Sequence, residues 1–215
     1  MQLVKTALIL YAAVLFAIPL SQEEEVFKLN ISRSDLIESQ NYFYNPKVER
    51  NLSKTEVRTL IMNVMKQFNA SIRGSERYKL AEFIIDESKV YDFDPLLVTS
   101  LIAVESSFNH KATSYVGAQG LMQLMPFVAN DLAQQMNIDF SDETTLYNPY
   151  MNISIGLFFL KTLSELYKDN ELYYLAAYNF GPTKIRSLIS SGMKVPSAYA
   201  KKVLNHYNDI KTLEI

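Results

Sequence analysis

The sequence predicts an all-α fold, on three observations. Apolar residues recur at helical spacing in several segments, and helix-start and helix-stop signals separate these segments. No segment of convincing length alternates apolar and polar residues as a half-buried strand does. With 215 residues, 48% of them hydrophobic, the chain can bury a sizeable core. We expect one globular domain over 53–215.

The first 21 residues have the layout of a secretory signal peptide. Lys5 precedes an uncharged, apolar run over 6–20, and an acidic stretch begins at Glu23. This run is shorter than the ~20 residues that span a membrane, and an uncleaved anchor or a buried helix is the alternative. Because the chain has no Cys, it carries neither disulfides nor a lipidated N-terminal Cys. We expect an exported protein of the periplasm or cell envelope that is not a lipoprotein, with a polar, poorly ordered lead over 22–52.

Two helices are predicted at the start of the domain. Ser53 and Glu56 have the spacing of a capping box. The apolar residues that follow share one helical face: Val57, Leu60, Ile61, Val64, Met65 and Phe68. We expect a break at 73–75 and then a second helix, whose inward residues are Tyr78, Ala81, Ile84 and Ile85.

Similar signals predict the remaining helices. Asp94 with Pro95, and Asn148 with Pro149, each combine an N-cap residue with a proline at the first helical position. Further helices are expected over 95–107, 126–136, from 149 onward, 171–179, 182–190 and 196–207. Residues 109–120 are expected to form a loop.

Charge and composition exclude several classes of function. The net charge is −2, with 21 basic and 23 acidic residues, so a nucleic-acid partner is not expected. The chain has only two His, far apart in sequence, and no Cys, which argues against zinc sites and His-based triads. We expect no metal and no cofactor.

Glu105 is the most informative residue of the third predicted helix. It is the only acidic or basic residue between Pro95 and His110, and helical spacing places it in line with Val98 and Ile102. A carboxylate in an apolar stripe loses hydration, which predicts a raised pKa for Glu105. A carboxylic acid that stays protonated near neutral pH is what glycoside cleavage needs. The alternative is a Glu at the end of a helix that faces solvent.

Polar groups suited to a ligand follow in the chain. Ser114 precedes the segment GLMQLMP, in which Gln123 is the lone amide, and Tyr178 with Asn179 ends a predicted helix. Each of these residues also has a structural interpretation, as a helix cap, a core residue or a helix end.

Taken in order, four motifs resemble the catalytic domain of soluble lytic transglycosylases, relatives of goose-type lysozyme. The motifs are ESSFN from Glu105, GAQGLMQLMP from Gly117, NP from Asn148 with Asn152, Ile153 and Gly156, and AYNFGP from Ala177. The resemblance covers about 75–207. The sequence departs from the family pattern before Tyr199, where Val195 and Pro196 replace a common Glu-Thr, and at His110 and Phe180, where Pro and Ala are common.

The resemblance implies a lysozyme-like helical fold with a cleft for the glycan strand of peptidoglycan. It implies cleavage of the β-1,4 bond between N-acetylmuramic acid and N-acetylglucosamine, with Glu105 as the catalytic residue. The substrate-binding residues that it implies are Ser114, Gln123, Met125, Tyr178, Asn179 and Tyr199.

In the implied reaction, Glu105 first donates a proton to the glycosidic oxygen. It then takes the proton of the C6 hydroxyl of the same muramic acid, which closes onto C1 and leaves a 1,6-anhydro end. One alternative is a hydrolase that uses water and a second carboxylate, for which Asp139, Asp142 and Glu143 are candidates. The other is a non-catalytic glycan-binding module. We expect a monomer, with 22–52 as a candidate contact for a partner in an envelope complex.

Overall fold

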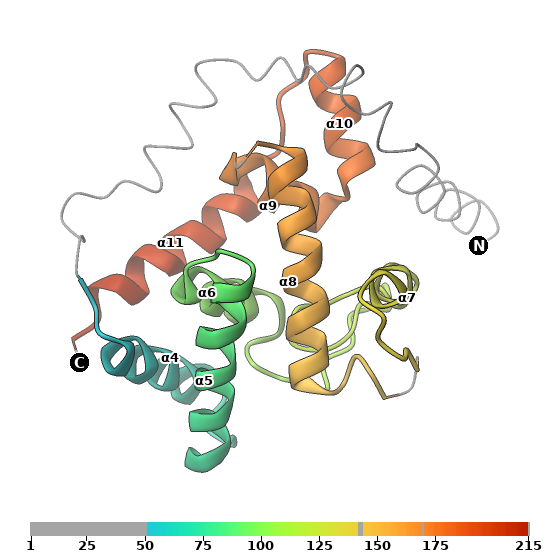
Figure 1. Cartoon of the computed structure of the whole chain (residues 1–215). Helices are drawn as coiled ribbons and strands as arrows, with labels where there is room; N and C mark the ends of the chain where they lie inside the picture. The colour runs from blue at the N-terminus through green and yellow to red at the C-terminus, as the bar shows by residue number, and fades with distance from the viewer. Residues whose placement is uncertain (1–50, 142–143, 169, 215) are drawn as a thin grey trace. The chain divides into compact units, whose positions relative to one another are not determined.

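A computed structural model describes residues 51–141, 144–168 and 170–214. Within these residues the chain forms eight helices and no strand (Figure 1). The all-α prediction is therefore confirmed. No helix in this part of the chain is long and apolar enough to cross a membrane. The predicted signal over 1–21 and almost all of the predicted lead over 22–52 lie outside the described residues.

The described residues form two compact units, and α8 and α11 each contribute to both. The larger unit comprises 51–162 and 201–214 of the described residues, and the smaller unit comprises 163–200. In chain order the helices are α4 (Lys54–Phe68), α5 (Gly74–Val90), α6 (Pro95–Ser106), α7 (Pro126–Gln135), α8 (Pro149–Leu166), α9 (Glu171–Phe180), α10 (Pro182–Ser190) and α11 (Ala198–Thr212).

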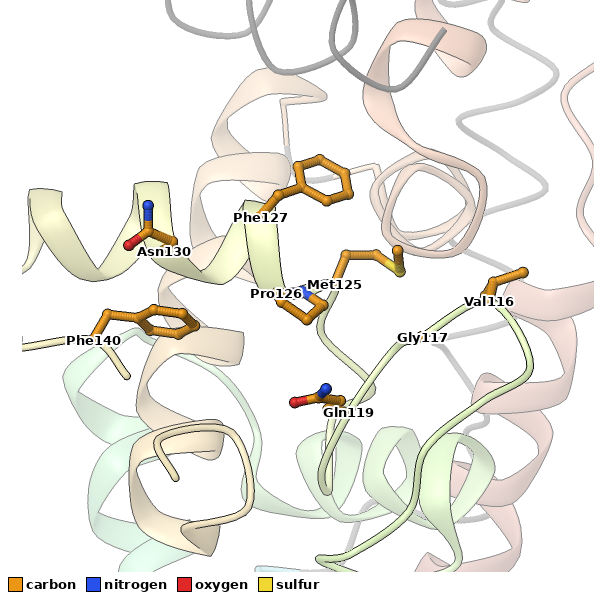
Figure 2. A pocket seen from close by; sticks show the side chains of 8 residues that line it. All are labelled: Val116, Gly117, Gln119, Met125, Pro126, Phe127, Asn130 and Phe140. Atoms are coloured by element: carbon orange, nitrogen blue, oxygen red, sulfur yellow. The ribbon is translucent and has the colours of Figure 1, made fainter. Parts of the chain in front are cut away.

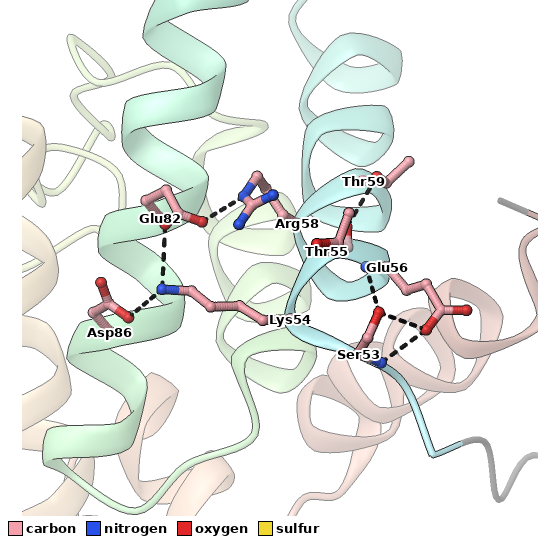
Figure 3. Close-up of polar contacts among 8 residues, drawn as sticks. All are labelled: Ser53, Lys54, Thr55, Glu56, Arg58, Thr59, Glu82 and Asp86. Carbon is pink, nitrogen blue, oxygen red and sulfur yellow. Dashed lines mark hydrogen bonds and ion pairs between the residues drawn. The ribbon is translucent and has the colours of Figure 1, made fainter.

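The predicted capping box begins α4. The Ser53 backbone N–H donates to Glu56 Oε2 at 2.8 Å, and the Glu56 N–H donates to Ser53 Oγ at 3.3 Å (Figure 3). Four apolar residues of the predicted face are buried: Leu60, Ile61, Val64 and Met65. Local capping and an apolar stripe are thus sufficient to explain this helix.

Ion pairs join α4 to α5 on their exposed side. Lys54 Nζ lies 2.9 Å from Asp86 Oδ1 and 3.2 Å from Glu82 Oε2, and Arg58 Nε also binds Glu82 (Figure 3). The hydrogen bond from Arg58 lowers the pKa of Glu82, and that from Lys54 lowers the pKa of Asp86. These pairs are solvent-accessible, so they stabilise the helix pair only weakly.

Two details of the α5 prediction are wrong. The break between the helices precedes Gly74, which already lies in the first turn of α5. Tyr78 was expected to face inward but is 46% exposed, and the Arg58 guanidinium lies 5.1 Å from its ring centroid. The buried stripe of α5 centres on Ala81 and Ile84, and Tyr78 lies at its edge, where an amphipathic ring can rest beside a cation.

α6 is the most buried helix of the larger unit. Asp94 caps it by accepting from the Leu96 N–H at 2.8 Å, and eight consecutive residues, 96–103, are buried against α4, α5 and their neighbours. The second carboxylate oxygen of Asp94 accepts from the Tyr207 hydroxyl of α11 at 2.6 Å. Burial and this carboxylate raise the pKa of Tyr207. The start of α6 is therefore fixed within a packed core.

The predicted start of α8 is also confirmed, since Asn148 Oδ1 accepts from the Tyr150 N–H at 3.0 Å. In the smaller unit α9 packs on α10, and the buried Tyr167 hydroxyl donates to the Pro182 carbonyl at 3.0 Å. α11 runs to Thr212, five residues beyond the expected end. It continues because Tyr207 and Ile210 maintain its buried stripe.

Candidate active site

Glu105 lies on the last turn of α6, where the buried run ends. Val98 and Ile102 are fully buried, as the stripe predicted, and Glu105 itself is half-buried. Ser107 and Phe108 then adopt left-handed backbone conformations, with φ of 51° and 59°. Such conformations cost a non-glycine residue about 1–2 kcal/mol each. The chain thus turns sharply next to Glu105 and encloses Phe108, which is 1% exposed.

The loop that follows is held by its own backbone. The Gln119 and Leu124 backbones exchange hydrogen bonds of 2.9 and 3.0 Å, and a second bridge joins Thr113 to Gln119. Ser114 closes the intervening turn, because its Oγ accepts from the Ala118 N–H at 3.0 Å. The Ser114 hydroxyl therefore stabilises the turn of the loop in which it lies.

Gln123 stabilises the same loop. It has a positive φ of 49°, and its Nε2 donates to the Gly120 carbonyl at 2.9 Å and to the Ala112 carbonyl at 3.2 Å. The suggestion that Gln123 caps a helix is wrong, since the N-cap of α7 is Met125, without a side-chain cap. Among the described residues nothing donates to Gln123 Oε1, which leaves an acceptor for a ligand.

Asn152 on α8 holds the same loop, a role that its place in one of the motifs did not predict. It is fully buried. Its Oδ1 accepts from the Met122 N–H at 2.7 Å, and its Nδ2 donates to the Gln119 and Leu146 carbonyls, each at 3.0 Å. One side chain thus uses three hydrogen bonds to fix the loop to α8. A lone amide in the apolar face of α8 was the signal that could have identified it.

Two glycines, Gly120 in the loop and Gly156 on α8, allow the loop to pack closely against α8. A Cβ on Gly120 would lie 2.1 Å from the Leu146 carbonyl oxygen and 2.2 Å from Asn152 Nδ2, and Gly120 has a φ of 79°. A Cβ on Gly156 would lie 2.4 Å from the Met122 sulfur. The backbone of the motif segment therefore packs where a side chain has no room.

A pocket of about 740 Å³ opens between the loop and α7 (Figure 2). The described residues that line it carry apolar or amide side chains and no charge: Val116, Gly117, Gln119, Met125, Pro126, Phe127, Asn130 and Phe140. Met125 is the one predicted site residue among them. These side chains offer a ligand apolar surface and a few polar groups.

The remaining predicted residues belong to the smaller unit. Tyr178 and Asn179 lie on the last turn of α9, the former half-buried and the latter exposed, and the half-buried Tyr199 lies in the first turn of α11. The structure thus brings Ser114, Gln123 and Met125 together in one loop, directly after the helix that carries Glu105. The other three residues lie in the smaller unit.

Two alternative chemistries, a metal site and a second carboxylate, would both need acidic groups. No cluster of three or more His, Asp or Glu that could hold a metal occurs in the part of the chain that the structure describes. Of the candidates for a second carboxylate, Asp139 is exposed, and Asp142 and Glu143 lie outside the described residues.

Comparison with known proteins shows several similarities in sequence. The family model described as Transglycosylase SLT domain matches residues 82–200. The soluble lytic murein transglycosylase of Salmonella typhimurium is 31% identical over 119 residues, which are 54% of this chain and 18% of that relative. The Escherichia coli K12 protein of the same name is 36% identical over 88 residues, 40% of this chain and 14% of the relative. The membrane-bound lytic murein transglycosylase C of Actinobacillus pleuropneumoniae is 35% identical over 103 residues, 44% and 28% of the two chains.

Solved structures show the same likeness in three dimensions. The 70 kDa soluble lytic transglycosylase of Escherichia coli has a TM-score of 0.57 and 26% identity, covering 84% of this chain and 34% of that one. A complex of a 70 kDa soluble lytic transglycosylase with bulgecin A has a TM-score of 0.52 and 27% identity, covering 75% and 29%. These matches confirm the predicted lysozyme-like helical fold. The sequence matches span less than a fifth of the Salmonella typhimurium and Escherichia coli K12 relatives.

Proposed function

Because the chain belongs to the transglycosylase SLT domain family, we propose that it is a peptidoglycan lytic transglycosylase. It would cleave the β-1,4 bond between N-acetylmuramic acid and N-acetylglucosamine and leave 1,6-anhydro ends. The observation that carries this proposal is the position of Glu105, half-buried at the end of a buried helix and directly before the loop that the family motif builds.

One carboxyl group is sufficient for this reaction. Glu105 donates its proton to the glycosidic oxygen as the C1–O bond breaks, and the leaving sugar departs as an alcohol. The resulting carboxylate then takes the C6 hydroxyl proton, while that oxygen bonds to C1 of the same sugar. The proton count balances without water, whereas glycoside hydrolases that use water ordinarily employ two carboxylates.

The other predicted residues would hold the glycan in place. Ser114, Gln123 and Met125 lie on a loop whose backbone is fixed, which favours orientation of the sugar at little entropic cost. Tyr178, Asn179 and Tyr199 would contribute from the smaller unit. In the full proposal, 1–21 directs export to the envelope, 22–52 is a lead with a candidate partner contact, and 53–215 acts on glycan strands as a monomer.

Digestion of purified peptidoglycan, followed by mass spectrometry, tests the proposal. Wild type should release fragments whose ends are lighter by one water than ordinary reducing ends. Glu105→Gln should fold normally and lose turnover by roughly 10²-fold or more, the usual contribution of a general acid. Glu87→Gln, on α5, is the matched control and should remain active.

Other outcomes of this digest have distinct meanings. Reducing ends in the wild-type digest would mean that water attacks, which is the hydrolase alternative. Full activity of Glu105→Gln would overturn the assignment of the catalytic residue. If wild type releases nothing but is retained on peptidoglycan in a pull-down, the chain is the binding module instead.

The pH profile gives a second test of Glu105. The sequence predicts a raised pKa for this carboxyl group, because ionisation in an apolar stripe removes hydration. Turnover should therefore decline as pH rises through that pKa, since the acid form starts the reaction. A flat profile from mildly acidic to basic pH would contradict the prediction.

A further inference from the structure

The turn that follows Glu105 is strained and contains no glycine. α6 ends at Ser106, and the next two residues both have a positive φ, 51° for Ser107 and 59° for Phe108. Many helices end in a left-handed conformation, but the residue there is usually Gly, because a Cβ makes that conformation unfavourable. A strained backbone persists only where its surroundings hold it. Contacts from outside α6 must therefore hold this turn.

Asn69, the C-cap of α4, binds the carbonyl of this turn. Its Nδ2 donates to the Phe108 carbonyl at 3.1 Å and is the only donor to that carbonyl in the described part of the chain. Its Oδ1 accepts from the Ser71 hydroxyl at 2.5 Å, and its backbone N–H donates to the Met65 carbonyl at 2.8 Å. Because the amide is held on both sides, it reaches the turn in a fixed orientation.

α4 provides a rigid base for this contact. Its apolar face packs against α5 and α6, and the centroid of the Phe68 ring lies 5.9 Å from that of the His206 ring on α11. The match to the family model begins at residue 82, so α4 and Asn69 precede it. The turn after the motif glutamate is thus supported by a helix that the family model does not include.

We propose that Asn69 is a positioning residue for Glu105. By binding the Phe108 carbonyl, it keeps Ser107 and Phe108 in their left-handed conformations, which keeps the last turn of α6 intact. Without this contact the end of α6 frays, and the Glu105 carboxyl group leaves the geometry that the reaction needs. This inference rests on the proposed function and adds to it a residue that precedes the family domain.

Kinetics of Asn69→Asp on purified peptidoglycan test this role. The variant keeps the size of the side chain and the acceptor for Ser71, but it loses the donor to the Phe108 carbonyl. We expect kcat to fall roughly tenfold or more with KM within about twofold of wild type, because Asn152 holds the glycan-binding loop separately. Asn63→Asp, exposed on the same helix, should change neither constant. An unchanged kcat in Asn69→Asp would overturn the proposal.

Val64→Ala separates positioning from general stability. Val64 is 1% exposed on the buried face of α4, so its truncation destabilises the helix without removing the contact to the turn. This variant should melt at a lower temperature than wild type but keep its kcat where it is folded. A loss of kcat equal to that of Asn69→Asp would mean that turnover follows stability alone, and would overturn the proposal.

Ser107→Gly provides a rescue that depends on the strain. Glycine adopts the left-handed conformation without the penalty of a Cβ, so the turn then needs less support from Asn69. Added to Asn69→Asp, Ser107→Gly should raise kcat roughly fivefold or more. Ser107→Ala removes the same hydroxyl but keeps the Cβ, and it should not restore kcat. Equal recovery with both substitutions, or with neither, would refute the role of the strained turn.

Hydrogen exchange keeps this inference distinct from the proposed function, because it requires no turnover. The Ser107 N–H donates to the Ala103 carbonyl at 3.1 Å, and the Asn109 N–H donates to the Ser106 carbonyl at 3.0 Å. Both amides should exchange roughly tenfold faster in Asn69→Asp than in wild type. This result supports the hold on the turn even if wild type releases no anhydro ends. Unchanged exchange at both amides overturns the inference even if the digest succeeds.

Discussion

The α4–α5 helix pair and the loop over 107–125 lie in the same unit but are stabilised in different ways. The helix pair buries an apolar stripe and has exposed ion pairs on its outer side, so its energy is spread over many residues. The loop depends on backbone hydrogen bonds and on a few side chains, of which Asn152, thirty positions downstream of Met122, makes three buried hydrogen bonds. A single substitution in the helix pair should therefore lower the free energy of unfolding only slightly, whereas a single substitution in the loop should lower it strongly.

The largest expected effect is that of Gly120→Ala. The added Cβ meets the Leu146 carbonyl and the Asn152 amide at about 2 Å, and neither atom can move without breaking the loop. We expect destabilisation of roughly 4 kcal/mol or more in urea unfolding. Gly117→Ala is the matched control: its φ is also positive, at 91°, but nothing lies within 4 Å of the new Cβ. It should cost only about 1 kcal/mol of backbone strain, and equal losses for both variants would refute the packing argument.

Asn152→Ala should have the next largest effect. It leaves the Met122 N–H and the Leu146 carbonyl buried without a partner and removes one of the two donors to the Gln119 carbonyl, at a cost of about 3 kcal/mol or more. Asn63→Ala, an exposed amide of α4, should stay within about 0.5 kcal/mol of wild type.

Hydrogen exchange at the Met122 backbone amide separates the effects of Asn152→Ala and Asn63→Ala more directly. Exchange of its N–H should accelerate in Asn152→Ala and remain unchanged in Asn63→Ala, because only the former loses the acceptor. Similar urea midpoints for the two variants would show that the loop is held by its backbone alone.

The sequence could predict the helices because their signals are local. The capping box at Ser53 and the cap-plus-proline pairs at Asp94 and Asn148 lie within four residues of the groups they bind. The prediction that Tyr78 points inward was wrong because the burial of a side chain does not depend on local signals alone. Helical spacing places a side chain on a face, but the width of the buried stripe depends on which helix packs there.

The candidate site was less predictable because its contacts are long-range. The sequence predicted a loop over 109–120, whereas the structure has a longer one between Ser106 and Pro126 that also includes Gln123 and Met125. Nothing in the spacing could reveal that the Asn152 amide reaches two carbonyls from different segments. The pocket wall of Asn130 and Phe140 carries no motif, and only the packing of α7 brings it opposite the loop.

The smallest expected effect, and the one that most clearly separates the two regions, is that of Glu82→Gln. Hydrogen bonds from Arg58 and Lys54 lower the pKa of Glu82 below its ordinary 4.5, and Lys54 lowers that of Asp86 below 3.8. A lowered folded-state pKa adds stability that is complete above the ordinary value and is lost as pH falls through the folded value. The small decrease in melting temperature caused by Glu82→Gln at pH 7 should therefore disappear in acid, and also in 1 M salt. Asn152 does not titrate and is buried, so the cost of Asn152→Ala should persist under both conditions. A Glu82→Gln effect that survives acid and salt would mean that the helix pair, like the loop, relies on specific packing at this position rather than on screened charge.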